Sequence, residues 1–375
     1  MTNMKIDDKT SHNSPSLRFP EFTGEWERCV LGDVLEFSNT RINSSELNSG
    51  NYVSTENILQ NFQGIVKARS IPEDTNVMAF SCGNILLSNI RPYLKKVWKA
   101  TFNGGCSSDV FVLQANSNID ADYLHYVVAN DKFIGFVMNG AKGVKMPRGD
   151  KNQMKTYSLS LPSIKEQRKI SRFLSFLDER IAVQSRLIDR LQSLMIGIRH
   201  RIINEAKGKI VCLCEVSDIY QPQTISSADL TETGYPVYGA NGIIGHYTSY
   251  NHEAEQVCIT CRGNTCGGVN YTKSKSWITG NAMVVNVDRY QNIVSKRYLY
   301  HYLSNCDFNS IISGSGQPQI VRAPLAKFKI ILPTVMQQYK IAHCLDVIQN
   351  KINVNSNILN LLIRQKQYLL RKMFI

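Results

Sequence analysis

Apolar residues recur at alternating steps of four and three along two stretches of the chain, residues 161–208 and 332–375. In the first stretch the repeat consists of Ile170, Leu174, Leu177, Ile181, Gln184, Ile188, Leu191, Met195, Ile198 and Ile202. In the second it consists of Ile341, Leu345, Ile348, Ile352, Asn355, Leu359, Leu362, Lys366, Leu369 and Met373. A sustained repeat near 3.5 residues predicts the seam of a coiled coil. We therefore expect two long helices of about 60 Å each, at about 1.5 Å per residue.

The two stretches also begin alike. Ser163 and Glu166 stand three residues apart near the start of the first stretch, and Thr334 and Gln337 stand in the same relation near the start of the second. Each pair fits the capping box, in which the hydroxyl and the third side chain satisfy free backbone N–H groups reciprocally. All four positions are related by a constant offset of 171 residues. The pattern indicates a duplicated helix with a duplicated start.

Both seams are interrupted by a polar residue at the same place, Gln184 in the first helix and Asn355 in the second. Each helix follows its own globular segment, so an antiparallel pairing would relate the two halves by a pseudo-two-fold axis. In that arrangement the two polar residues would lie in adjacent layers of the coil. A buried polar pair can fix the register of a coiled coil at a cost in stability. We interpret Gln184 and Asn355 as register residues.

Short β-like runs separated by turns fill the segment before each long helix, and the second segment repeats the plan of the first. The expected fold is α+β: two similar mixed α/β globular domains, separated by two long helices that form an antiparallel intramolecular coiled coil. The expected boundaries are a disordered lead-in at 1–15, a first domain at 16–160, a first helix at 161–208, a second domain at 209–331 and a second helix at 332–375.

The charge of the chain favours a polyanionic partner. Lys and Arg number 43 against 30 Asp and Glu, which gives a formal net charge of +13. Arg91 and Arg262 each end a strand-like run, from which an arginine could reach a base edge or a phosphate. An ordinary surface arginine, or one that pairs with a carboxylate, would give the same pattern. Gly- and Pro-rich loops near 140–150 and 314–322 carry further candidates, although a solvated turn remains the alternative.

The candidate DNA-binding residues are Arg91, Lys95, Lys96, Lys142, Lys145, Arg148, Arg262, Asn264, Gln317, Gln319 and Arg322.

The sequence offers little that indicates catalysis. Walker A, dinucleotide-binding and His-Glu-x-x-His motifs are missing, as is the Asn/Asp-Pro-Pro-Tyr/Phe motif of amino-group DNA methyltransferases. A metal-dependent nuclease remains an alternative, because nuclease carboxylate clusters have loose spacing. Cys258, Cys261 and Cys266 could suggest zinc, but no second Cys-x-x-Cys follows, and we expect no metal. Ten cysteines without a secretory signal favour a reduced cytosolic protein, and no apolar run predicts a membrane span.

Several short motifs give the chain a family resemblance. They are the Leu-Arg-Phe-Pro-Glu-Phe and Gly-Glu-Trp entry at 17–26, Leu-Gly-Asp-Val at 31–34, Leu-Pro…Glu-Gln at 161–167 with its weaker copy at 332–338, Tyr-Pro-Val-Tyr-Gly-Ala-Asn-Gly at 235–242, and Gly-Gly-Val-Asn-Tyr at 267–271. Together they resemble the specificity (S) subunit of type I restriction–modification systems. The resemblance covers nearly the whole chain. It identifies each globular domain as a target recognition domain and each long helix as a conserved spacer.

The resemblance implies a function and a set of partners. The chain would be non-catalytic and cytoplasmic, and each target recognition domain would read one half of a split site in double-stranded DNA. Two methyltransferase (M) subunits would methylate adenine N6 with S-adenosylmethionine, and restriction (R) subunits would use ATP and Mg²⁺; this chain itself would bind no cofactor. Alternatives are an S-like subunit of a type II or stand-alone modification methyltransferase and, in a different class, a coiled-coil scaffold without a DNA role.

Overall fold

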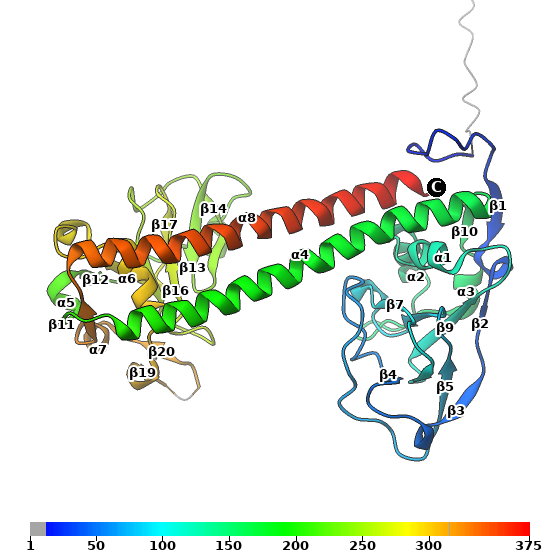
Figure 1. Ribbon diagram of the computed structural model, residues 1–375, viewed down its shortest axis with the longest axis horizontal. Helices are drawn as coiled ribbons and strands as arrows, with labels where there is room; N and C mark the ends of the chain where they lie inside the picture. The colour runs from blue at the N-terminus through cyan, green and yellow to red at the C-terminus, as the bar shows by residue number, and fades with distance from the viewer. Residues whose placement is uncertain (1–12, 315) are drawn as a thin grey trace, which may run out of the picture. The chain divides into compact units, whose positions relative to one another are not determined.

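The computed structural model describes residues 13–314 and 316–375 (Figure 1). The chain divides into two compact units: unit 1 is Met1–Val183 with Leu359–Ile375, and unit 2 is Gln184–Ile358. Two long helices, α4 (Ile164–Glu205) and α8 (Val335–Met373), each contribute to both units. No helix in the described part of the chain is long and apolar enough to cross a membrane.

Most of the lead-in expected at residues 1–15 lies outside the described residues. Asn13 is described, and it does not fit that expectation. Its backbone carbonyl accepts a hydrogen bond from Trp26 N at 3.0 Å, and its side-chain Oδ1 accepts one from Ser160 Oγ at 2.8 Å. Asn13, three residues before the expected boundary, is therefore bonded to the folded part of unit 1.

Unit 1 contains two four-stranded sheets, a two-stranded sheet and short helices. The first sheet has the order β2 (Leu35–Phe37), β9 (Val110–Ala115), β6 (Ile85–Ser88) and β7 (Val97–Lys99), and all its pairs are antiparallel. The second has the order β3 (Arg41–Asn43), β5 (Asn76–Phe80), β8 (Gly104–Cys106) and β4 (Tyr52–Val53), with β4 and β8 parallel. The remaining elements are β1 (Glu27–Val30) paired with β10 (Ser158–Leu161), and helices α1 (Ala121–Val128), α2 (Asp131–Asn139) and α3 (Lys151–Lys155).

Unit 2 repeats this plan. Its first sheet has the order β12 (Asp218–Tyr220), β18 (Ala282–Asn286), β15 (Val257–Thr260) and β16 (Val269–Tyr271), again all antiparallel. Its second has the order β14 (Gly242–Tyr247), β13 (Tyr235–Gly239) and β17 (Trp277–Ile278), with β13 and β17 parallel. The remaining elements are β11 (Lys209–Cys212) paired with β21 (Lys329–Leu332), β19 (Ile312–Ser313) paired with β20 (Gln319–Ile320), and helices α5 (Leu213–Val216), α6 (Lys296–Leu303) and α7 (Arg322–Ala326).

The duplicated order of the first sheet confirms the α+β class and the repeated plan expected from the sequence, while the second sheets differ in strand number. The central strands β6 and β15 are buried along their whole length, with the sequences Ile-Leu-Leu-Ser and Val-Cys-Ile-Thr. Continuous apolar runs suit a strand that is covered on both faces. Each of these strands leads directly into a turn that carries a candidate arginine, so the sheet fixes the backbone position of that arginine.

The predicted seam of the long helices is buried within each unit. In unit 1 the core of the sheets and short helices also takes in Ile170, Leu174 and Leu177 of α4 and Leu362 and Leu369 of α8. In unit 2, Ile188 and Met195 of α4 and Leu345 and Ile352 of α8 are buried. The two helices run antiparallel, because a step from Asp178 to Gln184 along α4 moves the bonded partner in α8 from Lys366 back to Asn355.

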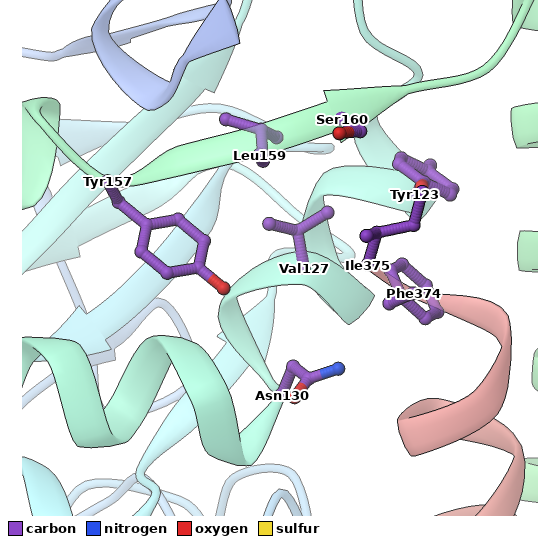
Figure 2. Close-up of a pocket in the computed structure, with 8 residues that line it drawn as sticks. All are labelled: Tyr123, Val127, Asn130, Tyr157, Leu159, Ser160, Phe374 and Ile375. Atoms are coloured by element: carbon purple, nitrogen blue, oxygen red, sulfur yellow. The ribbon is translucent and has the colours of Figure 1, made fainter. Parts of the chain in front are cut away.

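The end of α8 is part of the fold of unit 1. Asn130 Nδ2, just before α2, donates a hydrogen bond to the Leu370 carbonyl at 3.0 Å, and the Phe374 ring stacks on Tyr123 with centroids 5.1 Å apart. Figure 2 shows these aromatic rings around a small pocket, with Tyr157 on its other side. The end of α4 meets unit 2 in a corresponding way, at a pocket lined by Ile203, Asn204, Tyr302 and Asn305 among others.

Candidate nucleic-acid interface

The strand-end arginine of unit 1 lies against the Gly- and Pro-rich loop expected to carry recognition residues. Arg91 N donates to the Pro147 carbonyl at 2.8 Å, and Gly149 N donates to Asn89 O at 3.1 Å. The loop is itself a hairpin, in which Lys142 and Arg148 exchange both backbone hydrogen bonds at 2.9 Å. Two segments that are about fifty residues apart in the sequence thus form one surface.

Unit 2 brings the corresponding segments together in the same way. Gly263 N donates to the Pro318 carbonyl at 3.0 Å, and Arg262 forms an antiparallel bridge with Gln319. Both loops begin with a glycine in the left-handed region, Gly143 at φ 94° and Gly314 at φ 89°. An L side chain rarely adopts this conformation, so glycine suits the turn into each loop. The duplication therefore extends to the geometry of the candidate interface.

Most of the candidate cations of unit 1 have intramolecular partners. Lys95 Nζ lies 2.5 Å from Asp131 Oδ1, Lys142 Nζ lies 3.0 Å from Asp150 Oδ2, and Arg148 Nη1 lies 3.2 Å from Asp109 Oδ1. Lys96 Nζ donates to the Thr55 carbonyl at 2.5 Å, and burial lowers its pKa against a smaller opposing effect of Glu56. Exposed ion pairs are worth about 0–1 kcal/mol, so DNA phosphates could replace these carboxylates. In the structure these four cations are thus bonded to groups of the protein itself.

Arg91 and Lys145 differ from those four. Lys145 is exposed near the tip of the hairpin. Arg91 is half-buried in a left-handed conformation at φ 51°, and its buried Nε has no hydrogen-bond partner among the described residues. A non-glycine residue in this region costs roughly 1–3 kcal/mol and is found most often at functional sites. Of the unit 1 candidates, Arg91 therefore has a guanidinium that is positioned by the fold and is still available to a ligand.

The candidates of unit 2 are mostly amides and lie around one turn. Arg262, Asn264, Gln317 and Arg322 are exposed, whereas Gln319 is half-buried in β20. Arg322 is the first residue of α7. Asparagine and glutamine can make paired hydrogen bonds to adenine, and arginine to guanine, in the major groove.

Sequence reasoning missed one residue of this surface, Asn241. Thr265 Oγ1 donates to Asn241 Oδ1 at 2.6 Å, and Thr260 Oγ1 donates to the Ala240 carbonyl at 2.5 Å. These bonds attach the turn between β13 and β14 to the turn that carries Arg262. The Tyr-Gly-Ala-Asn-Gly motif at 238–242 was the available signal, but nothing in its spacing indicates that it lies beside Arg262.

The two helix starts differ in how their caps are made. Thr334 and Gln337 form the full capping box: Thr334 N donates to Gln337 Oε1 at 3.1 Å, and Gln337 N to Thr334 Oγ1 at 3.4 Å. Glu166 N donates to Ser163 Oγ at 3.4 Å, but the Glu166 carboxylate turns away from the cap. It accepts two hydrogen bonds from Arg18, at 2.7 and 2.8 Å. The reciprocal box expected at the first helix is thus replaced by an ion pair, because the N-terminal arm brings a guanidinium to this carboxylate.

A glutamine follows Glu166 in the first helix and Gln337 in the second, and sequence reasoning did not single out either one. Gln167 Nε2 donates to Pro162 O at 2.9 Å, and Gln167 Oε1 accepts from Asp120 N, at the cap of α1, at 2.8 Å. Gln338 Nε2 donates to Pro333 O at 2.9 Å, and its Oε1 accepts from Ser295 N, at the cap of α6, at 2.8 Å. Both glutamines are buried. They join each long helix to the globular part of its unit and so set the angle at which the helix leaves.

The polar residues of the seam lie in contact. Gln184 Nε2 donates to Asn355 Oδ1 at 2.7 Å and to Asn355 O at 3.0 Å, and Asn355 Nδ2 donates to Lys351 O at 2.7 Å. Both side chains are half-buried. The contact has the geometry that a register-fixing pair requires, while the register function itself remains a prediction.

A second apolar stripe runs along the outside of each long helix. On α8, Val347, Val354, Leu361 and Tyr368 follow one another at steps of seven and are 55–63% exposed. The exposed apolar residues of α4 that form its stripe are Phe173, Phe176, Val183, Leu187 and Leu194. Large exposed apolar stripes mark interaction surfaces. A repeat of seven suits a partner helix.

The remaining chemistry gives no indication of a metal centre. Within residues 13–314 and 316–375, no group of three or more His, Cys, Asp or Glu side chains could hold a metal ion. Cys258 and Cys261 are buried, and burial raises the pKa of the Cys258 thiol to about 12. A thiol with a raised pKa remains protonated, so it is a poor metal ligand and nucleophile at neutral pH.

A family model described as "Type I restriction modification DNA specificity domain" matches the chain twice, at residues 23–193 and 206–364. The chain belongs to this family. The resemblance noted in the motifs is therefore confirmed, and each copy of the family domain contains one strand-end arginine, its paired loop and most of one long helix. The family description, a specificity domain, agrees with the expectation of a non-catalytic chain.

Individual relatives match smaller parts of the chain. The type I restriction enzyme EcoprrI specificity subunit of Escherichia coli is 31% identical over 148 residues, which cover 38% of this chain and 36% of the relative. A putative type I restriction enzyme specificity subunit of Haemophilus influenzae, S.HindORF215P, is 30% identical over 142 residues, covering 36% of each chain. These matches thus span only about a third of the length of the relatives.

Solved structures agree with the fold over nearly the whole chain. The S subunit of a type I restriction–modification system from M. genitalium is 16% identical, with a TM-score of 0.68 over 96% of this chain and 99% of that one. A chain from a structure on complex assembly and conformational transition of the type I R-M system is 19% identical, with a TM-score of 0.55 over 93% of this chain and 97% of that one. At these identities the likeness concerns the fold.

Proposed function

We propose that this chain is the DNA-recognition subunit of a type I restriction–modification complex and performs no chemistry itself. Each unit reads one half of a bipartite site in double-stranded DNA through the surface formed by its strand-end turn and its Gly- and Pro-rich loop. The observation that carries this proposal is the duplication of that surface in two copies of a DNA specificity domain. Two copies that differ in side chains suit a split, asymmetric DNA site.

The long helices set the spacing between the half-sites and hold the partner subunits. The outer apolar stripes of α4 and α8 provide one docking surface for each of two methyltransferase (M) subunits, and restriction (R) subunits join the complex. S-adenosylmethionine is bound by the methyltransferase subunits, and ATP with Mg²⁺ by the restriction subunits, so this chain binds no cofactor. A complex that modifies chromosomal DNA with these cofactors acts in the cytoplasm.

Methylome sequencing tests the recognition role. We expect co-expression of the chain with its methyltransferase partner to produce adenine methylation at one bipartite motif. Exchange of residues 207–331 for the second domain of a relative should change one half of the motif and leave the other intact. The absence of any bipartite motif, or a change in both halves after the exchange, would contradict the proposal.

Charge substitutions on α8 test the docking surface. Val354→Glu and Leu361→Glu place carboxylates in the outer stripe, and we expect them to abolish co-purification of a methyltransferase subunit. Both side chains are exposed, so the fold should be retained. Asn360→Glu is the matched control, because Asn360 is exposed on the same helix and, at 3.6 residues per turn, lies roughly 100–120° around its axis from Val354 and Leu361. Equal co-purification of all three variants would exclude the stripe as the docking surface.

A further inference from the structure

Three exposed apolar side chains lie on the two bonded segments that form the candidate interface of unit 1. Val144, at the tip of the hairpin closed by Lys142 and Arg148, is fully exposed, and Met146 is 46% exposed. Tyr93, which is 48% exposed, lies in the turn Pro92–Leu94 that follows Arg91. The backbone bond from Arg91 to Pro147 joins this turn to the hairpin. Apolar side chains are thus presented to solvent on a basic surface, which solubility alone does not explain.

The backbone around these side chains is fixed and strained. Arg91 and Lys95, on either side of the Pro92–Leu94 turn, are both left-handed, at φ 51° and 53°. Asn61 and Phe62 are left-handed as well, and their N–H groups donate to the carbonyls of Leu94 and Lys95, each at 3.1 Å. Four of the six non-glycine residues with positive φ in the described chain therefore meet here. Such strain clusters at ligand-binding sites, where it holds side chains in position.

The cations of this surface do not account for sequence reading. Lys95, Lys96, Lys142 and Arg148 are each bonded to a carboxylate or carbonyl of the protein, as described above. They create a positive field that attracts DNA phosphates, but phosphate contacts carry no sequence information. Lys142 and Arg148 remain largely exposed despite their ion pairs, and beside them the surface presents Lys145 and the three apolar side chains to solvent. A hairpin is narrow enough to enter the major groove, where thymine alone offers a methyl group.

We propose that Tyr93, Val144 and Met146 contact thymine methyl groups in the half-site that unit 1 reads and thereby set its sequence preference. The inference rests on the proposed function, which supplies the DNA partner and an adenine, hence a paired thymine, in the half-site. At the positions that correspond to these three, unit 2 has the polar residues Asn264, Ser315 and Gln317. The two units therefore read their half-sites with different chemistry, apolar contacts in unit 1 and amide hydrogen bonds in unit 2.

A thermodynamic cycle between protein and DNA tests the contact. The full chain in complex with its methyltransferase subunits is titrated with a duplex that contains its methylated motif, and with the same duplex carrying deoxyuridine for thymine in the unit 1 half-site. Deoxyuridine lacks only the methyl group. We expect roughly fourfold weaker binding per contacted methyl, at about 0.8 kcal/mol for one buried carbon. The variant Val144→Ser/Met146→Gln should bind the thymine duplex roughly tenfold more weakly and respond little to deoxyuridine.

Two further variants separate the contact from other effects. Val30→Ser replaces an exposed valine on β1 of the same unit, and the response to deoxyuridine should stay as in the unmodified chain. Tyr93→Asn should reduce the loss of affinity that deoxyuridine causes, and it should leave the slope of log affinity against log salt concentration unchanged. Lys145→Ala should reduce that slope by about one if Lys145 meets a phosphate. Since Val144 is fully exposed, its replacement should leave thermal unfolding unchanged.

The outcomes distinguish this inference from the function on which it rests. If the unmodified complex binds no duplex specifically, the proposed function fails. If it binds its motif specifically, but Val144→Ser/Met146→Gln binds equally well and responds equally to deoxyuridine, only the thymine contact fails. The thymine contact would also be overturned if the losses of binding free energy caused by the variant and by deoxyuridine simply added.

Discussion

Units 1 and 2 use the same buried glutamine where a globular part joins its long helix, yet their candidate DNA-binding loops share little side-chain chemistry. Gln167 and Gln338 make the same pair of bonds, to a proline carbonyl and to the N–H group at the cap of a short helix. The paired loops instead present Tyr93, Val144 and Met146 in unit 1, against amides in unit 2. A joint that must hold a helix at one angle permits few solutions. Under the proposed function, the two loops read different half-sites and therefore need different side chains.

The largest difference in stability between the two units is expected at the starts of the long helices. The Glu166 carboxylate is buried and depends on Arg18, whereas its counterpart Gln337 is exposed and uncharged. Removal of one partner from a buried ion pair costs about 3–5 kcal/mol, because a charge remains without compensation. We expect Arg18→Ala to lower the free energy of unfolding of unit 1 by about 3 kcal/mol, as measured by urea denaturation with probes in each unit.

Two variants control this prediction. The double variant Arg18→Ala/Glu166→Gln should recover most of the loss, because no buried charge is left. Gln337→Ala in unit 2 should cost only about 1 kcal/mol, the usual value for a capping interaction. Equal losses from Arg18→Ala and Gln337→Ala would mean that the two helix starts are held in the same way.

The buried glutamines should behave alike. Gln167→Leu and Gln338→Leu each leave a backbone N–H and a proline carbonyl without a partner, at a cost of about 1–3 kcal/mol. We expect each variant to destabilise its own unit by about 2 kcal/mol and to leave the other unit unchanged, as followed by hydrogen exchange at α1 and α6. A difference of more than about 1 kcal/mol between the two would show that the joints are not equivalent.

His252 of unit 2 is buried, and burial lowers its pKa; larger shifts occur at His125 in α1 and His301 in α6. Burial lowers the pKa of both from 6.5 to about 4, although Asp346, which accepts from Arg297 and bonds His301, acts in the opposite direction on His301. The unfolded chain therefore binds more protons between pH 6.5 and 4. Stability is fully present above pH 6.5 and is lost as the pH falls toward 4.

The size of this acid loss can be measured separately in each unit. We expect each histidine to cost its unit about 1–2 kcal/mol between pH 7 and pH 4.5 in urea denaturation. His125→Gln should flatten the pH dependence of unit 1 only. His301→Gln should reduce that of unit 2 only and leave the contribution of His252. A variant with the same pH slope as the unmodified chain would show that another group causes the acid loss.

The sequence was sufficient for the features that repeat and insufficient for those that depend on a distant partner. The seam could be predicted because Ile170, Leu174 and Leu177 are apolar at coiled-coil spacing, and the helices indeed bury them. The pairing of Arg91 with Pro147 could not be predicted, since it is set by backbone bonds between loops. The same holds for Glu166: its residue type suggested a cap, but only the fold brings Arg18 to it. Local pattern determines elements, while long-range contacts determine which charges are already paired.

The smallest expected effect concerns the one pair of seam residues that links equivalent positions of the two helices. Gln184→Leu removes the donor to the half-buried Asn355 Oδ1 and should lower the free energy of unfolding of unit 2 by about 1 kcal/mol. The double variant Gln184→Leu/Asn355→Leu should recover this loss, or more than recover it, through apolar packing. Stability therefore does not require the polar pair. If the pair fixes the register, the double variant should gain stability yet methylate sites with more than one spacer length, because Leu tolerates alternative alignments. A methylome with the single spacer of the unmodified chain would show that the joints at Gln167 and Gln338, and not the seam, fix the alignment of the two helices.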